Sequence, residues 1–251
     1  MVLSAALRAI GFAAVLCAIG QAANAAEIKL IASRAVQEAY GELLPAFEKQ
    51  TGNKVTVSWG GTGDIVKRIN DGEIADIVIV TDVAIDGLIK GGKLTDTGSA
   101  IVAKSPTGAA VKEGAMKPDL SSSESFKKYL AASKGIVLTP GPSNPALHQM
   151  LDKLGLTEAM KTKEVKPAGS QILTDPVVQG KADIVFSQAS ELIKVKGISY
   201  AGPFPPGMQI TLTYKAAYHT KAPQLAAAKA LVAFLTKPDA AKALKENGLE
   251  P

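Results

Sequence analysis

The chain has 251 residues, of which 47% are apolar, and its formal net charge is +5 at pH 7. This positive charge is mild, the lysines are scattered and aromatic residues make up only 5% of the chain, so the composition argues against a nucleic-acid-binding protein. The single cysteine, Cys17, falls within an N-terminal apolar run, so the rest of the chain has no thiol for a disulfide or a cysteine metal site.

The N-terminus has the features of a secretory signal peptide. Arg8 supplies a positive charge before the apolar run 9–20, and this run is too short to span a bilayer as an anchor. Ala23 and Ala25 are small residues at the positions that a signal peptidase recognises, so residues 1–25 form the predicted signal peptide. We expect cleavage after Ala25 and export to the periplasm.

Downstream of this segment, β-rich runs alternate with amphipathic segments, which is the pattern of a mostly parallel sheet covered by helices. The first part of the pattern predicts, in chain order, a strand at 27–32, a helix at 35–50, a strand at 54–58, a helix at 64–70, a strand at 77–80 and a helix at 83–90. Residues 100–103 and 108–111 then predict a strand that is interrupted at Ser105 and Pro106 and crosses to a second group of elements.

The second group opens with a helix that ends at Ala132 and begins with a capping box formed by Ser121 and Glu124. The elements expected after it are a strand at 135–138, a helix starting at Ser143, Asn144 and Pro145 and ending at 154, a short helix from 174, a strand at 182–186, a long strand at 208–218, and helices at 225–235 and 240–247. The long strand would return the chain to the first group.

Several short motifs, in this order and spacing, resemble the molybdate-type extracellular solute-binding proteins of ABC transporters. The motifs are a strand ending in Ala32-Ser33, the segment 47–52 (FEKQTG) before Val55, the turn 59–63 (WGGTG), the strand start 75–79 (ADIVI) and the late strand 180–185 (GKADIV). The resemblance covers essentially the whole chain after the signal peptide.

This resemblance implies an α/β fold of the type II periplasmic binding protein class, with two lobes that are each a mostly parallel sheet flanked by helices. Two crossing strands join the lobes, and the ligand lies between them. The implied boundaries are 26–103 together with 211–251 for lobe 1, and 104–210 for lobe 2. Open α/β sheets bind ligands at the same place, in the crevice beyond the strand ends.

Departures from the family pattern favour an organic anion over molybdate. The family holds a tetrahedral oxyanion with neutral donors, including two serines and a late-loop tyrosine; Ser33 matches the first serine, Thr62 replaces the second, and 186–191 contains no tyrosine. Arg34 follows Ser33, and a guanidinium can hold a carboxylate through two parallel hydrogen bonds. The chain therefore resembles a divergent branch whose ligands are organic di- or tricarboxylates of the aconitate type.

The predicted ligand-binding residues lie at strand ends and helix starts, where free backbone N–H groups favour anions. They are Ser33, Arg34, Gly61, Thr62, Ser143, Asn144, Ser187 and Gln188. The alternatives are structural, because serines often only cap helices, glycine turns occur without a ligand, and an arginine can lie in solvent. Asp82 is expected to be structural, since a buried carboxylate would repel an anion. Trp59 fits a cleft wall or core packing equally well.

Two functions remain open from the sequence. The first is a monomeric receptor that closes on a small anionic ligand and delivers it to an ABC transporter permease. The second is an aconitate isomerase on the same scaffold, which would need a proton-transfer residue, and His148 is then the catalytic candidate because His219 falls beyond the return strand. We expect no metal and no cofactor for either function.

Overall fold

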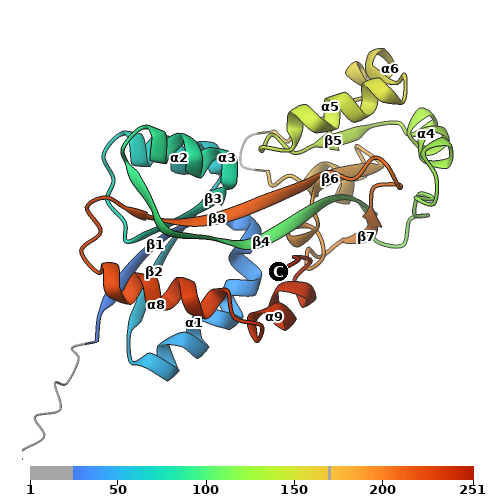
Figure 1. Cartoon of the computed structure of the whole chain (residues 1–251). Helices are drawn as coiled ribbons and strands as arrows, with labels where there is room; N and C mark the ends of the chain where they lie inside the picture. Colours follow the sequence, from blue (N-terminus) through green and yellow to red (C-terminus); the bar gives the residue numbers. More distant parts are fainter. Residues whose placement is uncertain (1–24, 169–170) are drawn as a thin grey trace, which may run out of the picture.

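Two long antiparallel strands connect two groups of helices and shorter strands (Figure 1). These strands are β4 (Leu94–Lys112) and β8 (Thr211–His219). The computed structural model describes residues 25–168 and 171–251. The predicted signal peptide, apart from Ala25, lies outside the described residues.

Lobe 1 is the group that contains the first strands and the end of the chain. Its further elements are β1 (Glu27–Ser33), the 3-10 helix η1 (Arg34–Val36), α1 (Gln37–Thr51), β2 (Lys54–Gly60), α2 (Thr62–Asn70), β3 (Ile77–Thr81), α3 (Asp82–Lys90), α8 (Leu225–Leu235) and α9 (Ala240–Glu246). Strands β2, β1 and β3 are parallel neighbours, and β8 continues the sheet by pairing antiparallel with β3. Apolar side chains of α1, α8 and α9 pack on one face of this sheet, and those of α2 and α3 on the other.

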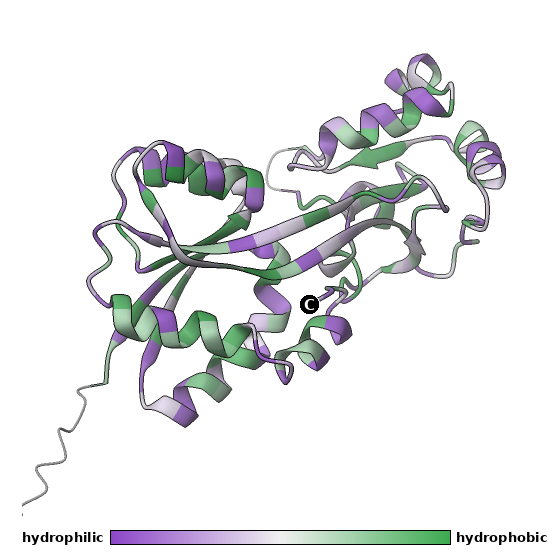
Figure 2. Ribbon diagram, in the orientation of Figure 1, coloured by the Kyte–Doolittle hydropathy of each residue, from purple (hydrophilic) through white to green (hydrophobic). Residues whose placement is uncertain are grey.

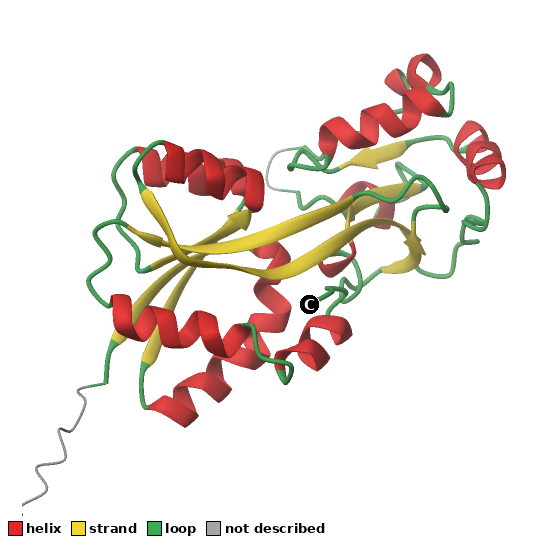
Figure 3. Cartoon of the chain, in the orientation of Figure 1, coloured by secondary structure: helices red, strands yellow, loops and turns green. Residues whose placement is uncertain are grey.

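Lobe 2 is built from one continuous stretch of chain between β4 and β8. Its elements are α4 (Ser123–Ala132), β5 (Ile136–Leu138), α5 (Asn144–Lys153), α6 (Thr157–Lys161), α7 (Asp175–Val178), β6 (Ile184–Gln188), the 3-10 helix η2 (Ala189–Glu191) and β7 (Ile198–Pro203). β5 and β6 are parallel, whereas β4 pairs antiparallel with both β6 and β7. The strands form a central layer with helices on both sides (Figure 3).

Each lobe has its own apolar core on both faces of its strands. Figure 2 shows apolar residues along the central strands and hydrophilic residues on the outer helix faces. In lobe 2, Phe126, Phe186 and Phe204 are buried and form a triangle with ring centroids 5.4–6.0 Å apart. Each lobe is therefore packed as a separate unit, and β4 and β8 pass between the two.

An aspartate stands directly before a buried strand in each lobe, fully buried at Asp76 and partly exposed at Asp183. Asp76 accepts hydrogen bonds from the backbone N–H groups of Lys29, at 2.8 Å, and Gln224, at 2.6 Å. Asp183 accepts one from the N–H of Lys134, at 2.7 Å. Each carboxylate thus fixes its strand to the beginning of the neighbouring parallel strand, β1 or β5.

The segment after α9 packs across the junction between the lobes. Glu250 and Lys104 of β4 exchange two backbone hydrogen bonds of 2.7 and 2.8 Å. Glu42 of α1 accepts from Lys194, at 3.2 Å, and from Asn247, at 3.0 Å, so it links lobe 1 to the residues that follow η2. Gly248 lies so close to η2 that a Cβ there would be 2.7 Å from the Ile193 side chain. The segment 247–250 is therefore a third connection beside β4 and β8.

Two local predictions are wrong. Helix α4 is capped by Ser122, whose hydroxyl accepts from the N–H of Ser125, and not by Ser121; Glu124 instead pairs with Lys128 at 3.0 Å. Strand β4 is also continuous through Pro106 rather than interrupted. Pro106 is the last residue that pairs with β8 and the next residue is the first that pairs with β6, so the missing N–H falls where the strand changes partner.

Candidate functional site

A pocket of about 530 Å³ lies between the two lobes. Four strands that have parallel neighbours end at this pocket: β1 at Ser33, β2 at Gly60, β5 at Leu138 and β6 at Gln188. The residues at or just after these ends line the pocket. This is the edge at which open α/β sheets bind ligands. The volume is in the range of sites for small organic molecules.

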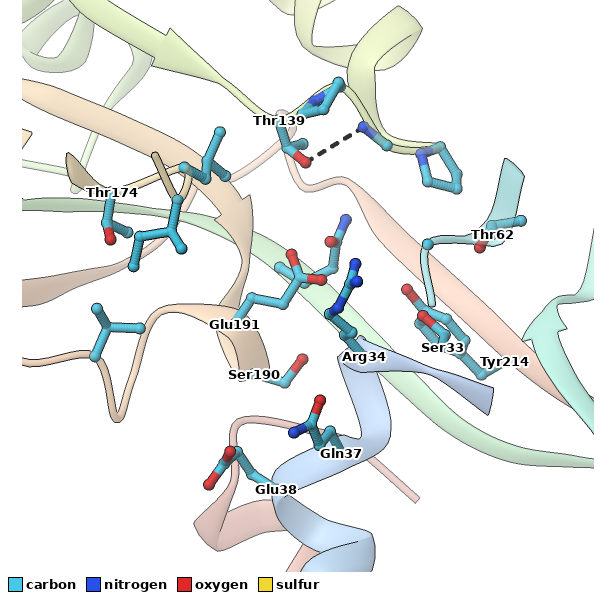
Figure 4. A pocket seen from close by; sticks show the side chains of 18 of the residues that line it. Ser33, Arg34, Gln37, Glu38, Thr62, Thr139, Thr174, Ser190, Glu191 and Tyr214 are labelled. Atoms are coloured by element: carbon cyan, nitrogen blue, oxygen red, sulfur yellow. Dashed lines mark hydrogen bonds between the residues drawn. The ribbon is translucent and has the colours of Figure 1, made fainter. Parts of the chain in front are cut away.

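Arg34 is the cation on the lobe 1 wall. The neighbouring Ser33 is buried and caps η1, with its hydroxyl accepting from the N–H of Ala35 at 3.3 Å. This cap turns the chain so that the Arg34 side chain projects into the pocket (Figure 4). Within residues 25–168 and 171–251, no carboxylate lies within 4.0 Å of its guanidinium. Arg34 is therefore available to an anionic ligand.

The start of α2 adds backbone donors on the same wall. Gly61 is the N-cap residue and buried Thr62 begins this nine-residue helix, and both line the pocket. The preceding Gly60 leaves room for the start of α2, because a Cβ there would be 2.9 Å from the Asp64 carboxylate and 3.0 Å from Ile65, and these side chains would have to shift. Helix starts present unpaired N–H groups and a partial positive charge, so this turn favours an anion.

The start of α5 faces the pocket from lobe 2, although its capping residues support the wall rather than line it. Asn144 donates to the carbonyl of Thr139 at 2.8 Å and closes the loop between β5 and α5. Ser143 is fully buried and accepts from the side-chain amide of Gln188 at 3.0 Å. Gln188 itself lines the pocket. Ser143 and Asn144 thus position pocket groups, and Gln188 is the one that a ligand can reach.

Glu191 is a pocket residue that the sequence prediction missed. Its carboxyl accepts a hydrogen bond from the Ser187 hydroxyl at 2.5 Å, and it shares the pocket with Arg34 (Figure 4). Burial raises the pKa of the Glu191 carboxyl, while the Ser187 hydrogen bond and the Arg34 charge oppose that shift. Ser187, predicted as a ligand donor, acts on Glu191. Nothing in the sequence pattern distinguishes this glutamate from an exposed one.

Tyr214 of β8 places a tyrosine in the pocket, although the late loop 186–191, where the family pattern has its tyrosine, contains none. Its ring is buried, and its side chain lines the pocket beside Ser33 (Figure 4). Burial and the nearby Glu191 charge raise the pKa of its phenol, so Tyr214 is a neutral donor at physiological pH. Because β8 crosses between the lobes, the phenol lies near the hinge of the pocket.

The remaining wall of the pocket is apolar. It consists of partly exposed side chains from the loops after β5, before α7 and after η2: Pro140, Pro142, Ile172, Leu173 and Val195. An inorganic oxyanion gains nothing from such a surface, whereas the hydrocarbon part of an organic acid is removed from water there.

The other sequence candidates lie away from the pocket. His148 is exposed on α5 and does not line it. Trp59 packs against the lobe 1 core. Among the described residues there is no cluster of three or more potential metal ligands, and no helix there has the length and apolar character needed to cross a bilayer.

The two-lobed fold, with a pocket between the lobes at the strand ends, defines a solute-binding protein as the class. The model of the bacterial extracellular solute-binding protein family matches residues 28–250, so the chain belongs to this family. The predicted recognition and fold class are therefore confirmed, with antiparallel pairs contributed by the two crossing strands.

Individual relatives within this class differ in function. An aconitate isomerase from a Pseudomonas species is 30% identical over 234 residues, which cover 89% of this chain and 87% of the isomerase. The molybdate-binding protein ModA of Azotobacter vinelandii is 27% identical over 237 residues, with 90% of this chain and 91% of ModA covered. The solved structure of the Azotobacter vinelandii periplasmic molybdate-binding protein superposes with a TM-score of 0.72 at 21% identity, covering 89% of this chain and 99% of that one.

Proposed function

We propose that this protein is a periplasmic receptor that binds a small organic anion with two or more carboxylates in the pocket between its lobes. The observation that carries the proposal is the combination of Arg34, which no carboxylate of the described residues approaches within 4.0 Å, on one wall with an apolar surface on another. Arg34 and the α2 start suit a carboxylate, and the apolar surface suits the carbon skeleton that joins the carboxylates.

Closure of the lobes would complete the site. The lobe 1 donors Arg34 and Thr62 and the lobe 2 donor Gln188 belong to separate half-sites that come together around the ligand. Hydrogen bonds to a charged ligand in such a cleft contribute about 1.5–3 kcal/mol each. In this proposal residues 1–25 are removed on export, the mature protein is a monomer, and the closed form is recognised by an ABC transporter permease.

Calorimetry of the mature protein tests the ligand class. We expect heat from trans-aconitate and tricarballylate and weaker binding of molybdate and sulfate, because only the carboxylates use both walls. Micromolar binding of molybdate together with no heat from any carboxylate would refute the proposal.

Arg34→Ala tests the residue that carries it. We expect affinity for trans-aconitate to fall by about 2–4 kcal/mol, with partial recovery in Arg34→Lys, since an ammonium lacks the planar fork. Lys90→Ala is the matched control, because it removes one positive charge from an exposed position of lobe 1 outside the pocket. If Arg34→Ala keeps wild-type affinity, the anion is bound by the helix starts and not by the Arg34 side chain.

An aconitate isomerase is the second candidate function. It is favoured by the Pseudomonas relative and by the presence of a titratable carboxyl, Glu191, in the pocket. The reaction removes a proton from the methylene carbon of trans-aconitate, leaves an allylic carbanion beside the carboxylates, and returns a proton to the far carbon, so that the double bond moves. Arg34 would stabilise the developing negative charge.

Incubation of the protein with trans-aconitate in deuterated water separates the two functions. An isomerase yields cis-aconitate with deuterium on carbon, whereas a receptor binds the acid and returns it unchanged. If turnover is seen, Glu191→Gln should lower it by about a hundredfold or more, the usual effect of losing a general base. His148→Gln should leave turnover intact, because His148 is exposed outside the pocket. Loss of turnover in His148→Gln alone would assign the proton transfer to the histidine.

A further inference from the structure

Glu191 is an acidic side chain in a pocket whose other features favour an anion. It ends η2 at the floor of the pocket, where burial raises the pKa of its carboxyl. The Ser187 hydroxyl donates to Oε2 at 2.5 Å, and within the described part of the chain Oε1 has no hydrogen-bond partner. One oxygen is thus fixed to the protein and the other is free to face a ligand.

The charges around Glu191 determine its protonation. The other ionisable side chains that line the pocket are Arg34 of η1, Glu38 of α1, Lys194 after η2 and Tyr214 of β8. Among the described residues, β4 and β7, which also pack against η2, contribute no ionisable side chain to the pocket. Lys194 is already paired with Glu42 at 3.2 Å. Arg34 is the cation that favours the ionised carboxylate of Glu191.

A bound anion cancels the effect of the Arg34 charge on the protonation of Glu191. When a ligand carboxylate pairs with Arg34, it neutralises the charge that favoured ionisation and places new negative charge beside Glu191. An ionised Glu191 would then repel the ligand inside a site of low water content. A neutral carboxyl instead offers an O–H donor, and a hydrogen bond from such a donor to a carboxylate is short and charge-assisted.

We propose that Glu191 binds the ligand as a neutral carboxylic acid, donating a hydrogen bond to a second ligand carboxylate while Arg34 holds the first. This rests on the proposed function of organic-anion binding and assigns the ligand class more narrowly, to acids with carboxylates on two sides of the carbon skeleton. It also couples binding to the uptake of a proton at any pH where Glu191 is ionised in the free protein.

Calorimetry of the mature protein with trans-aconitate, in two buffers of different ionisation enthalpy, measures this uptake directly. Above pH 7 the ligand carboxyls are ionised, so protons taken up belong to the protein. We expect the wild type to take up as much as one proton per ligand and to lose affinity as pH rises, by as much as about tenfold per unit. Glu191→Gln keeps the shape and a donor, so it should take up none and bind with the same affinity across this range.

The outcomes distinguish this proposal from the one on which it rests. Proton uptake that persists in Glu191→Gln would overturn the role of Glu191 and leave organic-anion binding intact. If no carboxylate binds at any pH, the receptor proposal fails, and carbon-13 NMR titration of the Glu191 carboxyl in the free protein decides the rest. A carboxyl that titrates at or below the ordinary glutamate range would overturn the neutral-acid role, and one that titrates above it would support that role for another anion.

Discussion

The two lobes begin a buried strand with the same device, but they use it with different strength. Asp76 of lobe 1 is 1% exposed and joins β1, β3 and the residue before α8 through hydrogen bonds to Lys29 and Gln224. The side chain of Asp183 in lobe 2 is 33% exposed, accepts from the N–H of Lys134, and pairs with the Lys134 ammonium at 3.4 Å.

The difference follows from how each lobe is assembled. Lobe 1 takes its strands and helices from both ends of the described chain, so its aspartate connects segments that are distant in sequence. Lobe 2 is one continuous stretch, and its aspartate joins two residues of that stretch through an exposed hydrogen bond, whereas Asp76 also reaches Gln224 near the end of the chain. A lobe fixed by an exposed hydrogen bond is expected to open locally at lower free energy than a lobe fixed by more buried ones.

Substitution of the two aspartates tests this comparison with the largest expected effect. Asp76→Ala should lower the free energy of unfolding by about 3 kcal/mol, because it leaves buried N–H groups without an acceptor. Asp183→Ala should cost about 1 kcal/mol, since water can replace its carboxylate. Urea unfolding followed by circular dichroism measures both, and equal losses would show that the lobes are fixed with equal strength.

Acid stability should also differ between the lobes. Hydrogen bonds from Arg68 lower the pKa of Glu73 in lobe 1 to about 2, from an ordinary value of 4.5. Because the folded pKa is the lower one, this stabilisation is present above pH 4.5 and is lost as pH falls toward 2. Glu73→Gln should cost about 1 kcal/mol at pH 7, after allowance for partial exposure, and nothing at pH 2. Unfolding at both pH values checks it, and a loss independent of pH would attribute the effect to packing.

The smallest expected effect concerns the lobe 2 half of the site. Ser143→Ala removes the hydroxyl that accepts from Gln188, so the amide loses its fixed orientation in the pocket. Affinity for trans-aconitate should fall by about 1 kcal/mol or less. Ser121→Ala, on the exposed loop before α4, is a control that should change nothing. An unchanged affinity in Ser143→Ala would mean that Gln188 does not contact the ligand.

Hydrophobic spacing predicted most of the helices and strands, because each buries a recognisable face, but it missed the short α6 and β7. The residue that caps a helix was harder to predict. Ser121 and Ser122 are equivalent as caps in sequence, and tertiary packing selects Ser122. The strand end at Ser33 and the helix start at Thr62 could be placed in the pocket from motif order. Glu191 could not, because its burial depends on how η2 packs against η1, and Tyr214 reaches the pocket only through the crossing of β8.

The segment 247–250 has a mechanical consequence for ligand choice. Two strands alone form a ribbon that can both bend and twist, but this segment, bonded to Lys104 through two backbone hydrogen bonds, is expected to stiffen the ribbon against twisting. Movement of the lobes would then favour bending over twisting. If the ligand is the organic acid proposed above, the separation between Arg34 and Glu191 in the closed form would set the length of acid that fits between the lobes.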